Sequence, residues 1–154
     1  MDSKFAALVE HLAPKLAQLL ARPAVSNGAL PRTMPRSGIY LFTENRRHLY
    51  VGRSNDLRSR FRNHCGGTER AAPFAFLLAR EATGRTRASY RTGADSRAGL
   101  MGDPVFAAAF SAAKERIRTM EFRYVEETDQ NRQALLEIYC SVVLGTPYND
   151  FRNH

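Results

Sequence analysis

The stretch GIYLFTENRRHLYVG, residues 38–52, decides the fold of this chain. Its two ends are rich in aromatic and β-branched residues, which favour strands. The polar segment ENRR at 44–47 separates them, and this pattern is typical of a β-hairpin. A three-residue turn would place Tyr40 opposite Tyr50, and both tyrosines would then share one face of the hairpin.

A helix is expected directly after the hairpin, from about residue 54 to residue 63. Ser54 or Asn55 can cap its first turn, because a short polar side chain there accepts a backbone hydrogen bond. Arg60 and His64 are four residues apart, so they would share one face of this helix.

The remaining elements follow from the spacing of apolar residues. Helical spacing predicts helices over 73–82, 105–117 and 130–144, and alternation predicts a third strand over 120–125. The expected fold is α/β, of the α+β type, with a small antiparallel three-stranded sheet flanked by helices. The stripe expected to be buried on the last helix consists of Leu135, Ile138, Tyr139, Val142 and Val143.

The first 36 residues predict an amphipathic helix and a linker rich in proline and glycine, with a break or kink at Pro14. We expect residues 37–154 to form the main domain, with an insertion around 73–103. No secretory signal or apolar span is expected in this sequence, and its two cysteines show no metal-binding spacing. The expected location is the cytoplasm.

The charge of the chain indicates a polyanionic partner. Lys and Arg number 23 against 15 Asp and Glu, which leaves a formal net charge of +8. Most of these cations are arginines, whose planar guanidinium can grip a phosphate through two hydrogen bonds. The alternative is that arginine-rich codon usage and a solvated surface account for the excess, since a basic balance alone does not prove a nucleic-acid partner.

The motifs Gly38-Ile39-Tyr40 and Tyr50-Val51-Gly52 resemble the pair of tripeptides that names the GIY-YIG nucleases. Val51 stands where isoleucine is usual. The resemblance extends from residue 37 to about residue 150, because five more residues fit the family in the right order. These are Arg53, Arg60, His64, Glu137 and Asn149.

The resemblance implies an active site with one metal ligand, Glu137. A Mg²⁺ or Mn²⁺ ion can use a single protein carboxylate and fill its other positions with water and phosphate oxygens. Arg60 would hold the scissile phosphate. A tyrosine, Tyr40 or Tyr50, would act together with His64 to take the proton from water. The residues leave open which tyrosine acts, and whether His64 relays the proton or orients the tyrosine.

The expected function is a metal-dependent DNA endonuclease that hydrolyses phosphodiester bonds, of a restriction-like or repair-like kind. The alternatives are a catalytically inactive nucleic-acid-binding module and a partner of acidic proteins. A homodimer would allow both strands to be cut, because one active site nicks one strand. Asn149 is expected to support a tyrosine or the phosphate. The arginines expected to contact DNA are Arg53, Arg58, Arg62, Arg80, Arg85, Arg87, Arg91 and Arg97.

Overall fold

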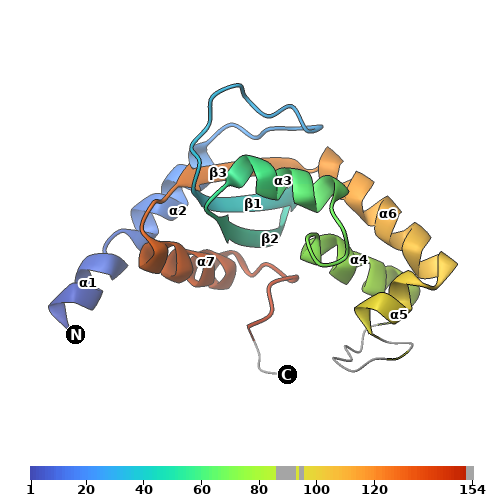
Figure 1. Cartoon of the computed structure of the whole chain (residues 1–154). Helices are drawn as coiled ribbons and strands as arrows, with labels where there is room; N and C mark the ends of the chain where they lie inside the picture. Colours follow the sequence, from blue (N-terminus) through green and yellow to red (C-terminus); the bar gives the residue numbers. More distant parts are fainter. Residues whose placement is uncertain (86–92, 94–95, 152–154) are drawn as a thin grey trace. The chain divides into compact units, whose positions relative to one another are not determined.

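The computed structural model describes residues 1–85, 93 and 96–151. The chain divides into two compact units. The sheet unit consists of Met1–Arg60 and Met120–His154, and the helical unit consists of Phe61–Thr119. Figure 1 shows both units with their helices and strands. None of the helices in the described part of the chain has the length and apolar character needed to span a bilayer.

The sheet unit is built on three antiparallel strands. They are β1 (Gly38–Glu44), β2 (Arg47–Ser54) and β3 (Glu121–Glu126), in the order β2-β1-β3. The central strand β1 is buried along almost its whole length, whereas β2 and β3 form the two edges. The α+β fold with a small three-stranded sheet is thus confirmed.

The turn between β1 and β2 differs from the expected one. It has two residues, Asn45 and Arg46, with φ angles of 51° and 64°. A tight turn with two left-handed residues suits the right-handed twist of a hairpin. The shorter turn shifts the register by one residue, and a bulge between Phe42 and Thr43 shifts it by one more. Tyr40 therefore pairs with Gly52 and not with Tyr50, so the expected register was wrong.

The shared face of the two tyrosines is nevertheless confirmed. The register moved by two residues, and side chains alternate with a period of two, so no side chain changed face. Tyr50 pairs with Phe42, and the ring centroids of Tyr40 and Tyr50 lie 6.3 Å apart. Phe122 of β3 joins this layer, with its centroid 5.8 Å from that of Tyr40. We call this side of the sheet the tyrosine face.

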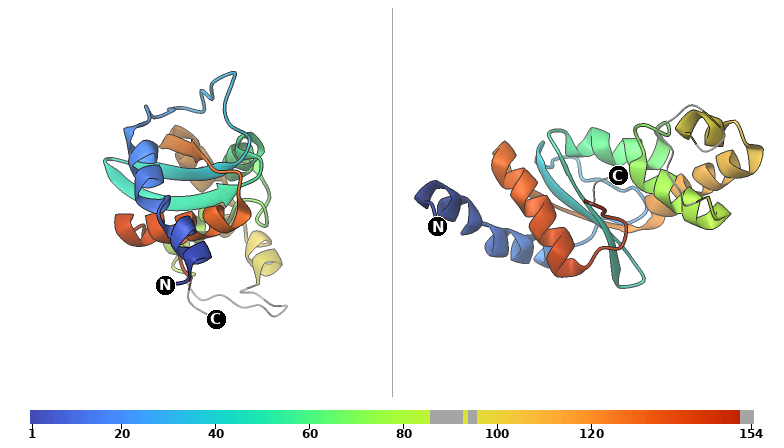
Figure 2. Two further views of the ribbon diagram at one scale, coloured as in Figure 1. Left: turned by 90° about the vertical axis from the view of Figure 1, so that its left-hand side faces the viewer. Right: turned by 90° about the horizontal axis from the view of Figure 1, so that it is seen from below.

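The opposite side, the core face, packs against helices from both ends of the chain. The first helix is divided, as expected near Pro14, into α1 (Ser3–Val9) and α2 (Leu12–Ala21). Proline is tolerated in the first turn of α2, where its missing N–H would have no helical partner. Figure 2 shows α2 and α7 (Gln130–Leu144) against this face. The core residues are Leu12, Leu16, Leu19, Ile39, Leu41, Val51, Val125, Leu136 and Cys140.

Helix α7 has the expected bounds but buries a different side. Ile138, Val142 and Val143 are 47%, 71% and 55% exposed, so they were wrongly expected to be buried. Leu135 and Tyr139, the other two residues of the expected stripe, are partly buried against the core. Gln133 is buried instead, because its amide donates to the main-chain oxygen of Glu127 at 2.7 Å. A buried amide without such a partner would be costly. This polar contact helps to fix which face of α7 meets the sheet.

Helix α3 (Leu57–Gly66) follows β2 and ends three residues beyond the expected position. Asp56 caps it, with its carboxylate accepting a hydrogen bond from the backbone N–H of Ser59 at 3.1 Å. The expectation that Ser54 or Asn55 would cap α3 was therefore wrong. Ser54 instead accepts a hydrogen bond from the N–H of Asp56 at 2.9 Å and so supports the cap.

The helical unit contains α4 (Pro73–Thr83), α5 (Arg97–Met101) and α6 (Pro104–Thr119). The expected helices over 73–82 and 105–117 are confirmed. Aromatic rings join α4 to α6, since the ring centroid of Phe76 lies 5.2 Å from that of Phe106 and 6.3 Å from that of Phe110. This unit therefore has an aromatic core of its own.

Candidate active site

Tyr40 lies on the central strand, and its side chain extends over the edge strand β2. It is only 1% exposed. A Cβ atom added to Gly52 would come within 2.1 Å of the Tyr40 hydroxyl oxygen. The glycine of the second motif therefore provides the space in which the phenol lies, and this explains why the two motifs occur together.

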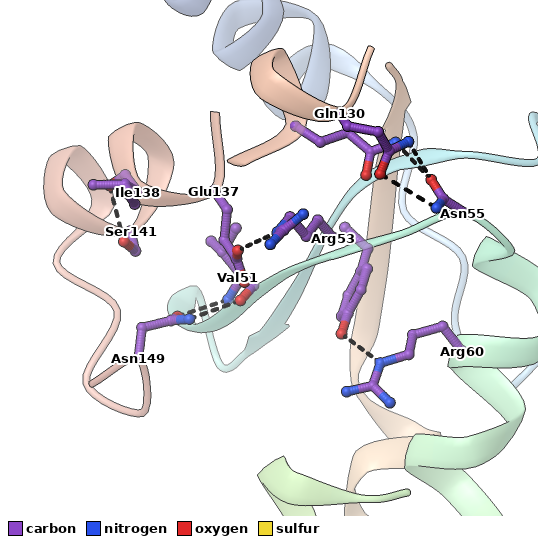
Figure 3. Close-up of polar contacts among 11 residues, drawn as sticks. Val51, Arg53, Asn55, Arg60, Gln130, Glu137, Ile138, Ser141 and Asn149 are labelled. Atoms are coloured by element: carbon purple, nitrogen blue, oxygen red, sulfur yellow. Dashed lines mark hydrogen bonds and ion pairs between the residues drawn. The ribbon is translucent and has the colours of Figure 1, made fainter. Parts of the chain in front are cut away.

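Arg60 contacts the tyrosines from α3. Its Nε donates a hydrogen bond to the Tyr40 hydroxyl at 3.2 Å, as Figure 3 shows. Hydrogen bonds also connect Tyr50 with Arg60 and with Tyr40. Two phenols and one guanidinium thus form a single hydrogen-bonded cluster.

Burial dominates the protonation of this cluster. It raises the pKa of Tyr40 far above the ordinary tyrosine value, and the neighbouring Tyr50 raises it further, while Arg60 opposes the shift. Burial likewise raises the pKa of Tyr50, again against the effect of Arg60. Burial lowers the pKa of Arg60, but the two phenols together raise it above its usual value. Both tyrosines are therefore neutral at physiological pH, and Arg60 is a cation.

Glu137 reaches the site from α7. Its Oε2 accepts a hydrogen bond from the Nε of Arg53 at 3.0 Å. Its side chain is 21% exposed, against 45% for Arg53. Burial raises the pKa of Glu137, although Arg53 and then Arg60 partly offset this effect. The carboxylate is therefore shielded from water but flanked by two cations.

Glu137 borders the same site as the tyrosines, although α7 packs on the core face. Arg53 pairs with Ile39 and so belongs to the core face, whereas the Tyr40 ring lies on the tyrosine face. Because β2 is an edge strand, groups from both faces can meet at its outer side. The carboxylate of Glu137 lies close enough to raise the pKa of both Tyr40 and Tyr50. Figure 3 shows Glu137 and Arg53 pointing toward each other beside β2.

Asn149 lies beside β2 and hydrogen-bonds its backbone. Its Oδ1 accepts a hydrogen bond from the N–H of Val51 at 2.8 Å, and its Nδ2 donates to the carbonyl of Val51 at 2.7 Å. The N–H of Tyr148 donates to the carbonyl of Leu49 at 3.3 Å. Tyr148 and Asn149 thus cover the outer edge of β2, and the side-chain amide of Asn149 holds Val51, the residue between Tyr50 and Gly52.

His64 lies on the part of α3 that belongs to the helical unit. Its side chain is fully buried, and its ring meets that of Phe74 edge-on at a centroid distance of 6.5 Å. Its action together with a tyrosine stays a prediction.

The arginines expected to contact DNA differ in their surroundings. In the sheet unit, Arg53 is paired with Glu137, and Arg58 donates to the main-chain oxygens of Pro31 and Arg32. Arg58 therefore fastens the segment before β1 to the start of α3.

Three arginines of the helical unit make internal contacts. Arg80 is buried and donates to the main-chain oxygen of residue 85. Arg85 pairs with Asp103 at 3.2 Å, and the guanidinium of Arg97 lies 4.6 Å from the ring centroid of Phe76. The exposed Arg62 is on α3. Arg87 and Arg91 lie outside the described residues.

Glu137 is the carboxylate that could hold a metal ion in this site. Among the residues that the structure describes, no group of three or more His, Cys, Asp or Glu side chains could bind a metal by itself. Mg²⁺ needs no such cage, since one carboxylate, water molecules and phosphate oxygens can complete its octahedron. The partly exposed carboxylate of Glu137 fits this mode of binding.

Three amide side chains near Glu137 were missed from the sequence. Asn55 follows β2 directly, and Gln130 and Gln133 occupy the first turns of α7. The side chain of Asn55 hydrogen-bonds both glutamines. Their signal was weak, because the only hint was a pair of glutamines preceding Glu137 on one helix.

The sheet unit is an α/β domain whose hairpin, α3 and α7 bring together two tyrosines, an arginine and a carboxylate. Residues 36–92 match the family model of the GIY-YIG catalytic domain. The part of the chain that carries the hairpin and α3 is therefore similar to the catalytic domain of the GIY-YIG nucleases. The matched residues include Tyr40, Tyr50 and Arg60 but end before Glu137 and Asn149, which are joined to the site by the contacts above. No curated protein and no solved structure matches the chain.

Proposed function

We propose that this protein is a metal-dependent DNA endonuclease that hydrolyses phosphodiester bonds. The convergence of Glu137 and Arg60 on the hydrogen-bonded pair Tyr40 and Tyr50 supports this function most strongly. These groups match the needs of phosphodiester hydrolysis, which requires a cation for the phosphate, a group that accepts a proton and an anchor for a metal ion.

Arg60 binds the scissile phosphate and stabilises the negative charge that develops as water attacks. The Tyr40 hydroxyl accepts a hydrogen bond from Arg60 and holds the guanidinium in place. Charge stabilisation in a partly buried site is typically worth about 10²–10³ in rate for one donor. The half-exposed Arg53 can exchange its carboxylate partner for a second phosphate oxygen.

Glu137 would hold Mg²⁺ or Mn²⁺. Such an ion, when bound, polarises a phosphoryl oxygen and makes a bound water more acidic. Tyr50 is better suited than Tyr40 to act as the base, because it is less buried. It would first have to lose its own proton, and the adjacent Arg60 would favour that step. His64 would relay that proton or orient the tyrosine.

The DNA duplex would extend beyond the site along further arginines. Phosphate contacts of this kind carry most of the salt dependence of binding. Asn149 supports Tyr50 through the backbone of Val51. The candidate DNA contacts are Arg53, Arg58, Arg62, Arg85, Arg87 and Arg91.

The second candidate is a nucleic-acid-binding module without catalytic activity. Supercoiled plasmid, single-stranded DNA and branched DNA should be incubated with the protein in Mg²⁺, Mn²⁺ or EDTA. The endonuclease predicts cleavage in either metal and none in EDTA. Binding that weakens with salt, without cleavage of any substrate, would identify the binding module. Nicked or linear product, followed against protein concentration, shows whether two copies act together.

A further inference from the structure

Every second residue from Val51 to Asn55, at the end of β2 and just after it, makes a polar contact with α7 or with the segment that follows α7. Asn55 bonds Gln130 and Gln133, Arg53 bonds Glu137, and the backbone of Val51 bonds Asn149. Figure 3 shows these contacts side by side along the strand.

The spacing of the first two contacts is matched between strand and helix. Moving from Asn55 to Arg53 covers two strand residues, or about 6.6 Å. Moving from Gln133 to Glu137 covers four helical residues, or about 6 Å. A slip of one residue along α7 would turn each side chain by about 100° about the helix axis and break both contacts.

Four hydrogen bonds hold together the amide cluster of Asn55, Gln130 and Gln133 and join it to the backbone of Glu127. The Nε2 of Gln130 donates to the Oδ1 of Asn55 at 2.8 Å, and the Nδ2 of Asn55 donates to the Oε1 of Gln130 at 3.3 Å. The Nε2 of Gln133 is shared between the Oδ1 of Asn55 at 3.2 Å and the carbonyl of Glu127 at 2.7 Å. Gln133 is 1% exposed, so water does not replace these bonds at low cost.

We propose that Asn55 and Gln133 are positioning residues that set the register of α7 along β2 and so present Glu137 beside Arg53 and the tyrosines. The functional part of this inference rests on the proposed nuclease activity. The structural part, the placement of Glu137 against Arg53, does not.

The test has one measurement without catalysis and one with it. Hydrogen exchange of the Arg53 Nε–H, followed by NMR of the free protein, reports how firmly Glu137 holds Arg53. Asn55→Ala and Gln133→Met should each speed this exchange by about fivefold or more. Exchange at the Arg60 Nε–H, which bonds Tyr40, should stay unchanged and serves as an internal reference.

Two further variants separate positioning from general damage. Asn55→Asp keeps the oxygen that accepts from Gln130 and Gln133, so it should restore slow exchange. Asn131→Ala removes an exposed asparagine from the same helix and should change neither measurement. In cleavage assays, Asn55→Ala should lower kcat by about tenfold at saturating Mg²⁺ with KM for DNA roughly unchanged, because a small misplacement of a catalytic group is costly.

Unchanged exchange at Arg53 in both Asn55→Ala and Gln133→Met would overturn the proposal. Faster exchange together with the kcat loss supports it in full. If the wild-type protein cuts no DNA while exchange responds as expected, the proposed function fails and the register inference stands.

Discussion

The hydroxyl group of Tyr40 lies directly over Gly52, so that a Cβ atom at Gly52 would come within 2.1 Å of the phenolic oxygen. The two motifs on which the family resemblance rests are thus parts of one contact. The first supplies the phenol, and the second supplies the space for it beside Arg60.

Gly52→Ala should displace the Tyr40 ring from Arg60. We expect a loss of about 1–3 kcal/mol in the free energy of unfolding, because an inserted methyl group overpacks the site. Cleavage should fall more steeply than stability. Urea denaturation and single-turnover cleavage measure the two effects. Gly66→Ala is the matched control, since a Cβ atom there meets nothing within 4 Å. Equal behaviour of the two variants would refute the contact's importance.

Arg60→Lys should retain the positive charge but lose the planar guanidinium that bonds both phenols. We expect cleavage to decrease by about 10²–10³, close to the loss in Arg60→Ala. Single-turnover rates at saturating DNA provide the comparison. Arg118→Ala, which removes an exposed arginine paired with Glu115, is the control. Near-normal rates in the lysine variant would mean that charge alone is sufficient.

The buried tyrosines should make the protein less stable in alkali. Burial raises the pKa of Tyr40 and Tyr50 in the folded state above the unfolded value of about 10. The stability that the two neutral tyrosines contribute is fully present below a pH of about 10. It is lost as the pH rises further, because the tyrosines then ionise in the unfolded chain but not in the folded protein. In that range each of these tyrosines should lower the free energy of unfolding by about 1.4 kcal/mol for every pH unit. Urea denaturation between pH 8 and 11 should show a shallower decline for Tyr40→Phe. The same decline in both proteins would contradict this account.

Asn149→Ala should loosen the edge of β2. It removes two hydrogen bonds to Val51 and leaves a backbone N–H and a carbonyl to water. We expect a loss of about 1–2 kcal/mol in the free energy of unfolding, and faster hydrogen exchange at the Val51 amide. Thr146→Val removes only a hydroxyl that donates to Asn149, so its effect should have the same direction and be smaller. An unchanged Val51 exchange rate in Asn149→Ala would show that this amide does not hold the strand.

Local patterns predicted the secondary structure well, because each element is encoded within its own residues. The helices over 73–82, 105–117 and 130–144 and the third strand all follow from apolar spacing. The hairpin register did not follow, because it depends on Asn45 and Arg46 both adopting left-handed angles. The turn length and the bulge between Phe42 and Thr43 together decided the register, and side-chain alternation alone could not.

The site was predictable only where a motif carried it. Tyr40, Tyr50 and Arg60 lie within twenty-one residues of sequence and were recognised together. The amide cluster joins Asn55 to Gln133 across 78 residues, and no local pattern encodes such a contact. The buried side of α7 was missed for the same reason, since a polar residue, Gln133, faces the interior.

Glu137→Gln tests the central claim most directly. The amide keeps the size of the side chain but removes the charge that would hold a divalent ion. We predict that the variant folds and binds DNA as the wild-type protein does, yet cuts it at least about 10²-fold more slowly in Mg²⁺. Cleavage at the wild-type rate by Glu137→Gln would contradict the proposed site.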